Sequence, residues 1–312
     1  MKKNRNMITS ILLALPLVLF LMMGCGKEGD VQENKKLKIV ATTGMIADGA
    51  RNIVGDHAEV IGLMGPGIDP HLYKATQNDL KLLSDADIIL YNGLHLEGKM
   101  AEVLEKLSAR KPVIAVGDAI DPSVLRSPPE FEGAYDPHIW FDVSLWRKAM
   151  AGLVDTLAGL DNANAESYRT EGESYVVKLD SLDHWVREQI ASLPESSRLL
   201  VTAHDAFGYF GRAYKIDVRG LQGISTVSEF GLADRNSMVD LIVQRKAKAV
   251  FVESSVPRRN IEALIEGVKA KGHEVRIGGE LFSDAMGAEG TPEGTYIGMV
   301  RANVNTIVEG LQ

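Results

Sequence analysis

The chain alternates between short apolar runs and longer segments whose apolar residues recur every three or four positions. Short apolar runs indicate strands, and helical spacing indicates amphipathic helices. We expect strands at 37–42, 60–63, 88–91, 113–116, 199–203, 218–221, 249–252 and 275–277. We expect helices at 45–54, 76–84, 97–108, 144–159, 233–245, 260–271 and from about 293 to the end. Strands that alternate with helices favour an α/β fold with mainly parallel sheets.

One segment in the middle of the chain differs from this alternation. Residues 162–193 contain no proline and one glycine, Gly172, and their apolar positions keep helical spacing while charged residues fill the other face. A single helix here would span about 45 Å at 1.5 Å per residue, the width of a domain. We therefore expect two α/β lobes, 37–159 and 195–312, bridged by one long helix at 160–194.

The residues before the first expected strand have the features of a secretory signal. Basic residues near the start precede an apolar run from residue 7 to 23, and the small residue Gly24 follows. We expect residues 1–24 to be a signal peptide. A retained anchor helix is the alternative, because the run approaches the length of a membrane span.

Cys25 directly follows this segment and is the only cysteine in the chain, so it cannot form an internal disulfide. With the apolar and small residues before it, it resembles the lipidated cysteine of a bacterial lipobox. We expect Cys25 to carry lipid and residues 25–36 to form a polar tether, which places the protein outside the cytoplasm at a bacterial membrane. A cysteine that is incidental to the signal peptide is the alternative.

The charge of the chain narrows the class of ligand. The formal net charge is −8, and removal of residues 1–24 makes it more negative because that segment holds basic residues and no acids. An acidic protein is a poor partner for nucleic acid or for an anionic lipid surface. A cation is the more natural ligand.

A repeated tripeptide supplies the first candidate ligands for a cation. Asp-Pro-His occurs at residues 69–71 and again at 136–138. Proline fixes its own φ angle and keeps the preceding residue extended, so each histidine follows a rigid, non-helical turn. His71 follows an expected strand, where ligands of parallel sheets gather. His71 and His138 would therefore belong to one site on the first lobe.

The second lobe offers two residues at equivalent positions. His204 comes where strand 199–203 ends, and Asp284 lies in a glycine-flanked loop after strand 275–277. Two donors from each lobe would hold a cation between the lobes.

Four longer strings carry a resemblance to a known family. They are Asp-Pro-His-Leu-Tyr-Lys-Ala-Thr, Tyr-Asp-Pro-His-Ile-Trp-Phe-Asp-Val, Thr-Ala-His-Asp-Ala-Phe-Gly-Tyr-Phe and Gly-Glu-Leu-Phe-Ser-Asp-Ala-Met-Gly, at 69–76, 135–143, 202–210 and 279–287. They resemble the TroA-type family of zinc- and manganese-binding solute receptors of ABC importers, over essentially all of 37–312. The resemblance implies two α/β lobes bridged by one long helix, with a metal at their interface. It implies the ligands His71, His138, His204 and Asp284.

The ligand types bear on which metal is carried. Three imidazoles and a carboxylate suit a borderline divalent ion rather than Ca²⁺ or Mg²⁺. Three imidazoles favour Zn²⁺, whereas Asp284 bound through both oxygens would suit Mn²⁺. Many zinc-specific members of the family carry a long histidine-rich loop in the first lobe, and the corresponding segment here, 121–136, is short and has no histidine. We therefore expect Zn²⁺ or Mn²⁺ as the transported ligand.

Acidic neighbours of the histidines are candidates for supporting roles. Asp69, Asp136 and Asp205 adjoin expected ligands, and their carboxylates are expected to orient imidazole rings. For the two aspartates that precede proline, shaping the turn is the alternative. The remaining histidines are expected to have structural or surface roles; they are His57, His95, His184 and His273.

Together these observations predict a monomeric, extracytoplasmic receptor that delivers Zn²⁺ or Mn²⁺ to the permease of an ABC importer. A metal-dependent hydrolase is the main rival, but catalytic zinc keeps an open position, whereas four protein ligands favour capture. The sequence also lacks Gly-x-Ser-x-Gly and His-Glu-x-x-His motifs. We therefore expect no enzyme activity. A secondary role as a surface adhesin follows from the resemblance alone.

Overall fold

The computed structural model describes residues 36–131, 133–227 and 231–312. The predicted signal peptide, Cys25 and nearly all of the predicted tether lie outside the described residues. Residues 36–312 form one compact unit. Within the described part of the chain, no helix combines the length and the apolar character needed to cross a bilayer.

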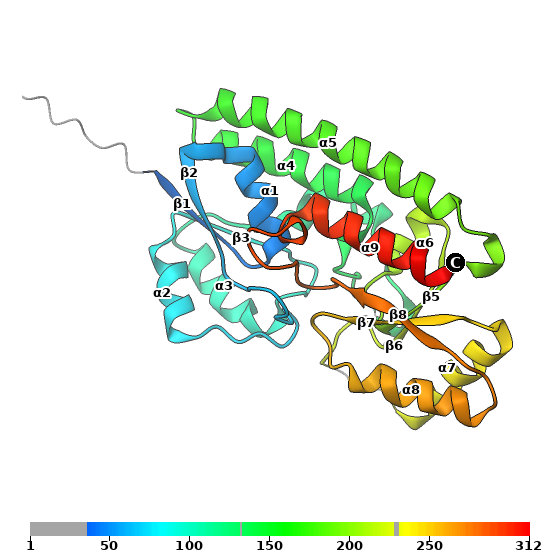
Figure 1. Ribbon diagram of the computed structural model, residues 1–312. Coiled ribbons are helices and arrows are strands. Elements are labelled where there is room, and N and C mark those ends of the chain that lie inside the picture. Colours follow the sequence, from blue (N-terminus) through cyan, green and yellow to red (C-terminus); the bar gives the residue numbers. More distant parts are fainter. Residues whose placement is uncertain (1–35, 132, 228–230) are drawn as a thin grey trace, which may run out of the picture. The chain divides into compact units, whose positions relative to one another are not determined.

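The first part of this unit is a parallel sheet of four strands in the order β2-β1-β3-β4 (Figure 1). The strands are β1 (Leu37–Ala41), β2 (Ala58–Gly62), β3 (Ile88–Tyr91) and β4 (Val113–Ala115). The helices between them are α1 (Gly44–Val54), α2 (Gln77–Asp85) and α3 (Ala101–Ser108). These elements match the predicted ones to within a few residues, and the sheet is parallel as expected.

The central strands of this sheet are buried on both faces, which explains their unbroken apolar runs. Ile39 and Leu90 face a large core that includes residues of α1, whereas Val40 and Ile89 face a smaller core with α2 and α3. Period-two alternation therefore separates two apolar layers here instead of an apolar face from a polar face.

The second part contains two parallel strand pairs, β5 with β6 and β7 with β8. The strands are β5 (Leu199–His204), β6 (Asp217–Gln222), β7 (Ala249–Glu253) and β8 (Arg276–Leu281). The helices of this part are α6 (Gly208–Tyr214), α7 (Leu232–Arg245), α8 (Arg259–Ala270) and α9 (Tyr296–Leu311). Because β5 also lies beside β7, the carboxyl ends of these strands come together.

Strand β8 is longer than the predicted strand at 275–277, because it continues through Gly278 and Gly279 to Leu281. Glycines normally weaken a strand because they have no side chain to pack. Here they make room for neighbours: a Cβ on Gly278 would lie 2.7 Å from the Phe251 ring. The same ring fills the space beside Gly310 of α9, so the missing side chains allow the last helix to pack closely on β8.

Two long helices join the two parts. Helix α4 (Val143–Leu160) packs along α5 (Ala165–Ala191). Helix α5 is the predicted bridging helix, but it begins a few residues later and ends a few residues earlier than the predicted range 160–194. Gly172 lets the two helices approach, since a Cβ there would lie 2.2 Å from a methyl group of Val154. The lobe boundaries 37–159, 160–194 and 195–312 stay a prediction, because the described residues form a single compact unit.

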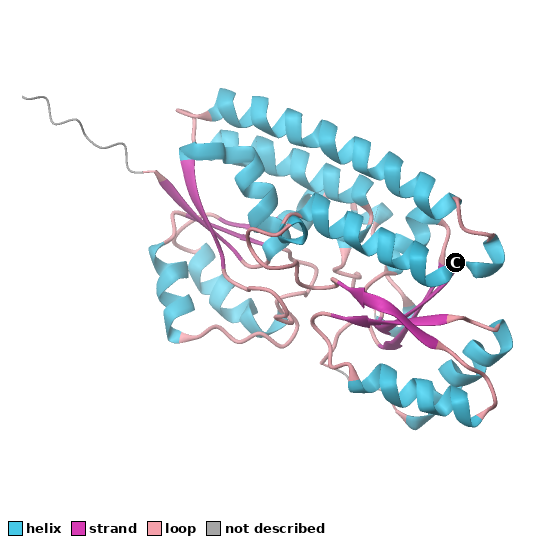
Figure 2. Cartoon of the chain, in the orientation of Figure 1, coloured by secondary structure: helices cyan, strands magenta, loops and turns pink. Residues whose placement is uncertain are grey.

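The C-terminal helix α9 is a further connection that the sequence did not suggest. It packs against β8 of the second part and also against α1 and α5. Tyr296 donates its backbone N–H to Asp48 of α1 at 3.0 Å and its hydroxyl to the Trp140 carbonyl at 2.7 Å. Loops at the ends of both sets of strands meet beneath these helices (Figure 2).

Candidate metal centre

His71 lies in the loop between β2 and α2, on the corner that its Asp-Pro pair forms. Asp69 accepts the backbone N–H of His71 through Oδ1 at 2.9 Å, while its Oδ2 accepts the Thr226 hydroxyl at 2.6 Å. Asp69 therefore shapes the turn and reaches a loop of the second part, and it does not hold the imidazole. The His71 side chain is buried.

His138 lies just before α4 in a turn of the same kind, in which the aspartate also contacts the imidazole ring. Asp136 Oδ1 accepts both the backbone N–H of His138 at 3.0 Å and its ring Nδ1–H at 2.8 Å. Because Nδ1 is engaged in this way, the ring presents Nε2 to the interior of the site. The corner itself is fixed by Asn92, whose side-chain amide donates to the Pro137 carbonyl at 3.0 Å.

His204 is the last residue of β5, and Glu253, the last residue of the neighbouring strand β7, supports it. Glu253 Oε1 accepts the backbone N–H of His204 at 2.8 Å, and Oε2 lies 2.5 Å from the ring Nδ1. The His204 ring thus faces a carboxylate at Nδ1 as the His138 ring does, but through an ion-pair contact rather than the hydrogen bond that His138 makes to Asp136. In both cases a buried carboxylate occupies Nδ1 and leaves Nε2 for a ligand.

Asp284 follows β8 on a loop that two distant side chains hold. Asn303 of α9 accepts the Phe282 N–H at 2.9 Å and donates to the Phe282 carbonyl at 2.7 Å. The Trp140 indole donates to the Ser283 carbonyl at 3.1 Å. The backbone on the N-terminal side of Asp284 is thus fixed from α9 and from the segment that carries His138.

The four side chains converge on one point. His71 Nε2 lies 3.3 Å from His138 Nε2. Asp284 Oδ2 lies 3.7 Å from His71 Nε2 and 3.3 Å from His204 Nε2, and Asp284 Oδ1 lies 3.4 Å from His138 Nε2. One ligand atom from each residue falls within 4.8 Å of all the others, and each residue is at most 3% exposed. Donors about 2.1 Å from a tetrahedrally bound ion lie about 3.4 Å apart.

The polar atoms at this point lack other partners. Among the described residues, neither oxygen of Asp284 has a hydrogen-bond donor, and His204 Nε2 is also without a hydrogen-bond partner. A buried carboxylate without hydrogen bonds costs several kcal/mol of folding free energy unless an opposite charge compensates it. A cation held between these atoms would satisfy all of them.

The three imidazoles differ in the direction in which their surroundings shift the pKa. Burial lowers the pKa of His71 to about 3. Burial also acts to lower the pKa of His138, but the hydrogen bond to Asp136 and the nearby Asp284 carboxylate outweigh it and raise the pKa to about 9. The carboxylates of Glu253 and Asp284 likewise outweigh burial and raise the pKa of His204 well above its usual value. Although burial disfavours its anion, Asp284 has a pKa well below the usual range because His204 and His138 face it.

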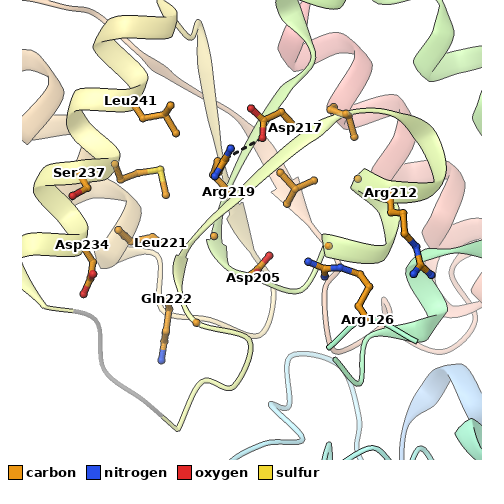
Figure 3. A pocket seen from close by; sticks show the side chains of 17 residues that line it. Arg126, Asp205, Arg212, Asp217, Arg219, Leu221, Gln222, Asp234, Ser237 and Leu241 are labelled. Carbon is orange, nitrogen blue, oxygen red and sulfur yellow. Dashed lines mark hydrogen bonds and ion pairs between the residues drawn. The ribbon is translucent and has the colours of Figure 1, made fainter. Parts of the chain in front are cut away.

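The structure assigns different roles to the residues that adjoin the cluster. Asp136 contacts an imidazole as predicted, whereas Asp69 acts on the backbone of its turn. Asp205, predicted to orient an imidazole, lines a cavity whose lining also includes Arg126 (Figure 3). Sequence reasoning missed Glu253, because its contact with His204 depends on β7 lying beside β5.

The other four histidines lie outside the cluster, in agreement with their expected roles. His184 is exposed on α5 beside Glu188, at 3.1 Å, and His273 Nε2 lies 2.8 Å from the Ala247 carbonyl. His57 packs edge-on against Tyr168, and His95 adopts a left-handed backbone with φ of 67°.

The chain is similar in sequence and in structure to metal-binding proteins. A family profile described as zinc-uptake complex component A, periplasmic, matches residues 39–310. A manganese-binding lipoprotein, MntA of Bacillus subtilis strain 168, is 50% identical over 295 residues, which cover 94% of this chain and 96% of MntA. The zinc-binding protein TroA of Treponema pallidum is 48% identical over 307 residues, covering 98% of this chain and 99% of TroA. The structure of periplasmic TroA superposes with a TM-score of 0.86 at 50% identity, covering 88% of this chain and 99% of that structure.

Proposed function

The chain belongs to the family of periplasmic zinc-uptake components, and from this premise we propose that it captures a divalent transition-metal ion outside the cytoplasm and delivers it to an ABC importer. The observation that carries the proposal is the buried Asp284 carboxylate, which has no hydrogen-bond partner among the residues that the structure describes and faces three imidazoles. The family consists of metal receptors rather than enzymes.

The proposed ligands are Nε2 of His71, His138 and His204 together with the carboxylate of Asp284. Their separations of 3.3–3.7 Å fit an ion of the size of Zn²⁺ or Mn²⁺. Asp136 and Glu253 support the proposal because each holds the opposite nitrogen of a ligand ring. Both Asp284 oxygens face imidazoles, so the carboxylate can bind through one oxygen or through both.

The cargo is proposed to be Zn²⁺ or Mn²⁺, and the donor set does not exclude either. A site of fixed nitrogen and oxygen donors binds Zn²⁺ more tightly than Mn²⁺, so metal availability decides which ion is carried. The two relatives agree with this view, since one is named for manganese and the other for zinc.

Metal analysis tests the proposal directly. Protein purified without chelators should contain about one equivalent of transition metal per chain, as a single four-ligand site requires. Added Zn²⁺ should displace bound Mn²⁺ in competition. Less than half an equivalent of metal, with no increase after either ion is added, would overturn the receptor function.

Proton release provides an independent measurement of the same site. Ligand imidazoles must be neutral, so at pH 7 the binding of one ion should displace protons from His138 and His204 but none from His71. Affinity should therefore fall about 100-fold for each pH unit below 7, because two protons compete with the metal. Calorimetry in buffers of different ionisation enthalpy counts the protons. Release of no protons would contradict the raised pKa values.

Anchoring through a lipid on Cys25 and a monomeric state complete the proposal. Cys25 lies outside the described residues, and support comes from the lipoprotein nature of the Bacillus subtilis relative. The Cys25→Ser variant should appear in the medium or the soluble extracytoplasmic fraction rather than with membranes. Unchanged membrane retention would favour an uncleaved anchor helix. The adhesin role stays a prediction from the resemblance.

A further inference from the structure

Asp136 has a second partner on the side that faces away from the metal cluster. Its Oδ1 binds the ring and backbone of His138, whereas its Oδ2 forms an ion pair with Nη1 of Arg126. Asp136 is fully buried, while the Arg126 side chain is 23% exposed. The guanidinium is thus the solvent-facing end of a line of contacts that runs through Asp136 to His138.

The backbone around this ion pair is closed by hydrogen bonds. The Asp136 N–H donates to the Arg126 carbonyl at 2.8 Å. Tyr209 of α6 accepts the Arg126 N–H at 3.0 Å and donates its hydroxyl to the Asp136 carbonyl at 2.9 Å. These bonds hold the two residues together independently of their side chains, so the guanidinium can be altered without releasing the segment that carries His138.

Space for the guanidinium is provided by a glycine and by an open cavity. A Cβ on Gly208 would lie 1.3 Å from Arg126 Nη1, so no other residue at position 208 leaves the arginine in place. Arg126 lines a cavity of about 990 Å³ with Asp205 and Arg212 among its other lining residues. Figure 3 shows these three side chains near one end of it. None of the proposed metal ligands lines this cavity, which makes it a separate approach to the ion pair.

We propose that Arg126 is a positioning residue for metal capture: its guanidinium fixes the Asp136 carboxylate so that the His138 ring keeps its proton on Nδ1 and presents Nε2 to the metal. Supporting hydrogen bonds of this kind contribute about 10–100-fold to metal affinity. The forked donors of arginine suit a carboxylate better than the point charge of lysine does. The inference rests on the proposed function, because it concerns one of the proposed ligands.

The test begins with Arg126→Ala, which should lower Zn²⁺ affinity about 10–100-fold. Arg212→Ala is the matched control: Arg212 lines the same cavity and stacks over the same Tyr209 ring at 5.0 Å, but makes no ion pair with Asp136. Its affinity should equal that of the wild type. Because the cavity is open to solvent, guanidinium chloride at about 10 mM should restore part of the affinity lost in Arg126→Ala, whereas equal NaCl should not.

A spectroscopic measurement on metal-free protein separates positioning from general loosening. At a pH high enough for the His138 ring to be neutral, ¹⁵N chemical shifts should report Nδ1–H in the wild type, where Asp136 accepts from Nδ1, and a mixture of tautomers in Arg126→Ala. If Arg126→Ala does not fold, the same measurements are made on Arg126→Lys. This variant should show a smaller loss of Zn²⁺ affinity and a partial change of the His138 tautomer.

The outcomes distinguish this inference from the proposed function. If the wild type binds Zn²⁺ while the Arg126 variants keep both its affinity and its His138 tautomer, the positioning role is overturned and the receptor function stands. If the wild type binds no metal, the receptor function falls, and the tautomer measurement alone still decides whether Arg126 orients the ring. An equal loss in Arg212→Ala would also overturn the positioning role.

Discussion

His138→Ala should lower the affinity for Zn²⁺ by about two orders of magnitude or more. Structural zinc sites bind with roughly 10–16 kcal/mol, so one of four ligands accounts for about 3 kcal/mol, or about 100-fold. The loss also leaves Asp284 Oδ1, 3.4 Å from the removed nitrogen, without its nearest imidazole. Competition with a chromogenic chelator of known affinity measures the change.

The control for this variant is His184→Ala. The His184 side chain is 76% exposed on α5, and its contact is Glu188, one helical turn away. Its removal should leave metal affinity within twofold of the wild type, since exposed ion pairs contribute little. Equal effects of the two substitutions would contradict the assignment of His138 as a ligand.

Asp284→Ala should have two effects, one on the metal and one on the metal-free protein. Asp284 is the anion among the proposed ligands and both its oxygens face imidazoles, so the loss of affinity should exceed that of His138→Ala, at about 1,000-fold or more. In the metal-free protein, the pKa of His138 should fall from about 9, because Asp284 is one of the two carboxylates that raise it.

A titration followed by NMR at the His138 ring measures the second effect. Asp284→Asn serves as the isosteric comparison, because it removes the charge and keeps the volume. Both variants should lower the pKa of His138, and only the alanine variant also opens space. An unchanged pKa in both would show that Asp136 alone sets the protonation of His138.

Much of the site could be predicted because its signals are local. Each Asp-Pro-His corner combines a fixed proline backbone with an aspartate that caps its own turn, and both features are readable within three residues. His204 was found from the position at which an apolar run ends. The proposed ligands His71, His138 and His204 are therefore predictable without knowledge of how distant segments pack.

Glu253 could not be assigned in this way, because its role depends on strand order. It ends an apolar run and resembles any acidic residue that leaves a strand for solvent. Its contact with His204 exists only because β7 lies beside β5, although 49 residues separate the two side chains in sequence. Sheet order in α/β folds is set by the packing of crossover helices, which the periodicity of single elements does not encode.

Helix α9 was missed as a connector for a related reason: its sequence predicts a helix but not the surface it covers. Its first residue binds Asp48 and the Trp140 carbonyl, and its Asn303 fixes the Phe282 backbone next to Asp284. Such contacts join residues far apart in sequence and carry no local pattern.

The place of Asn303 on helix α9 makes metal capture depend on that helix. The loop that presents Asp284 takes its shape from Asn303, which α9 carries. A chain without α9 can still contain His71, His138 and His204, but it lacks the ordered carboxylate. A variant from which Tyr296–Leu311 has been removed should therefore bind Zn²⁺ far more weakly than the chain that contains this helix.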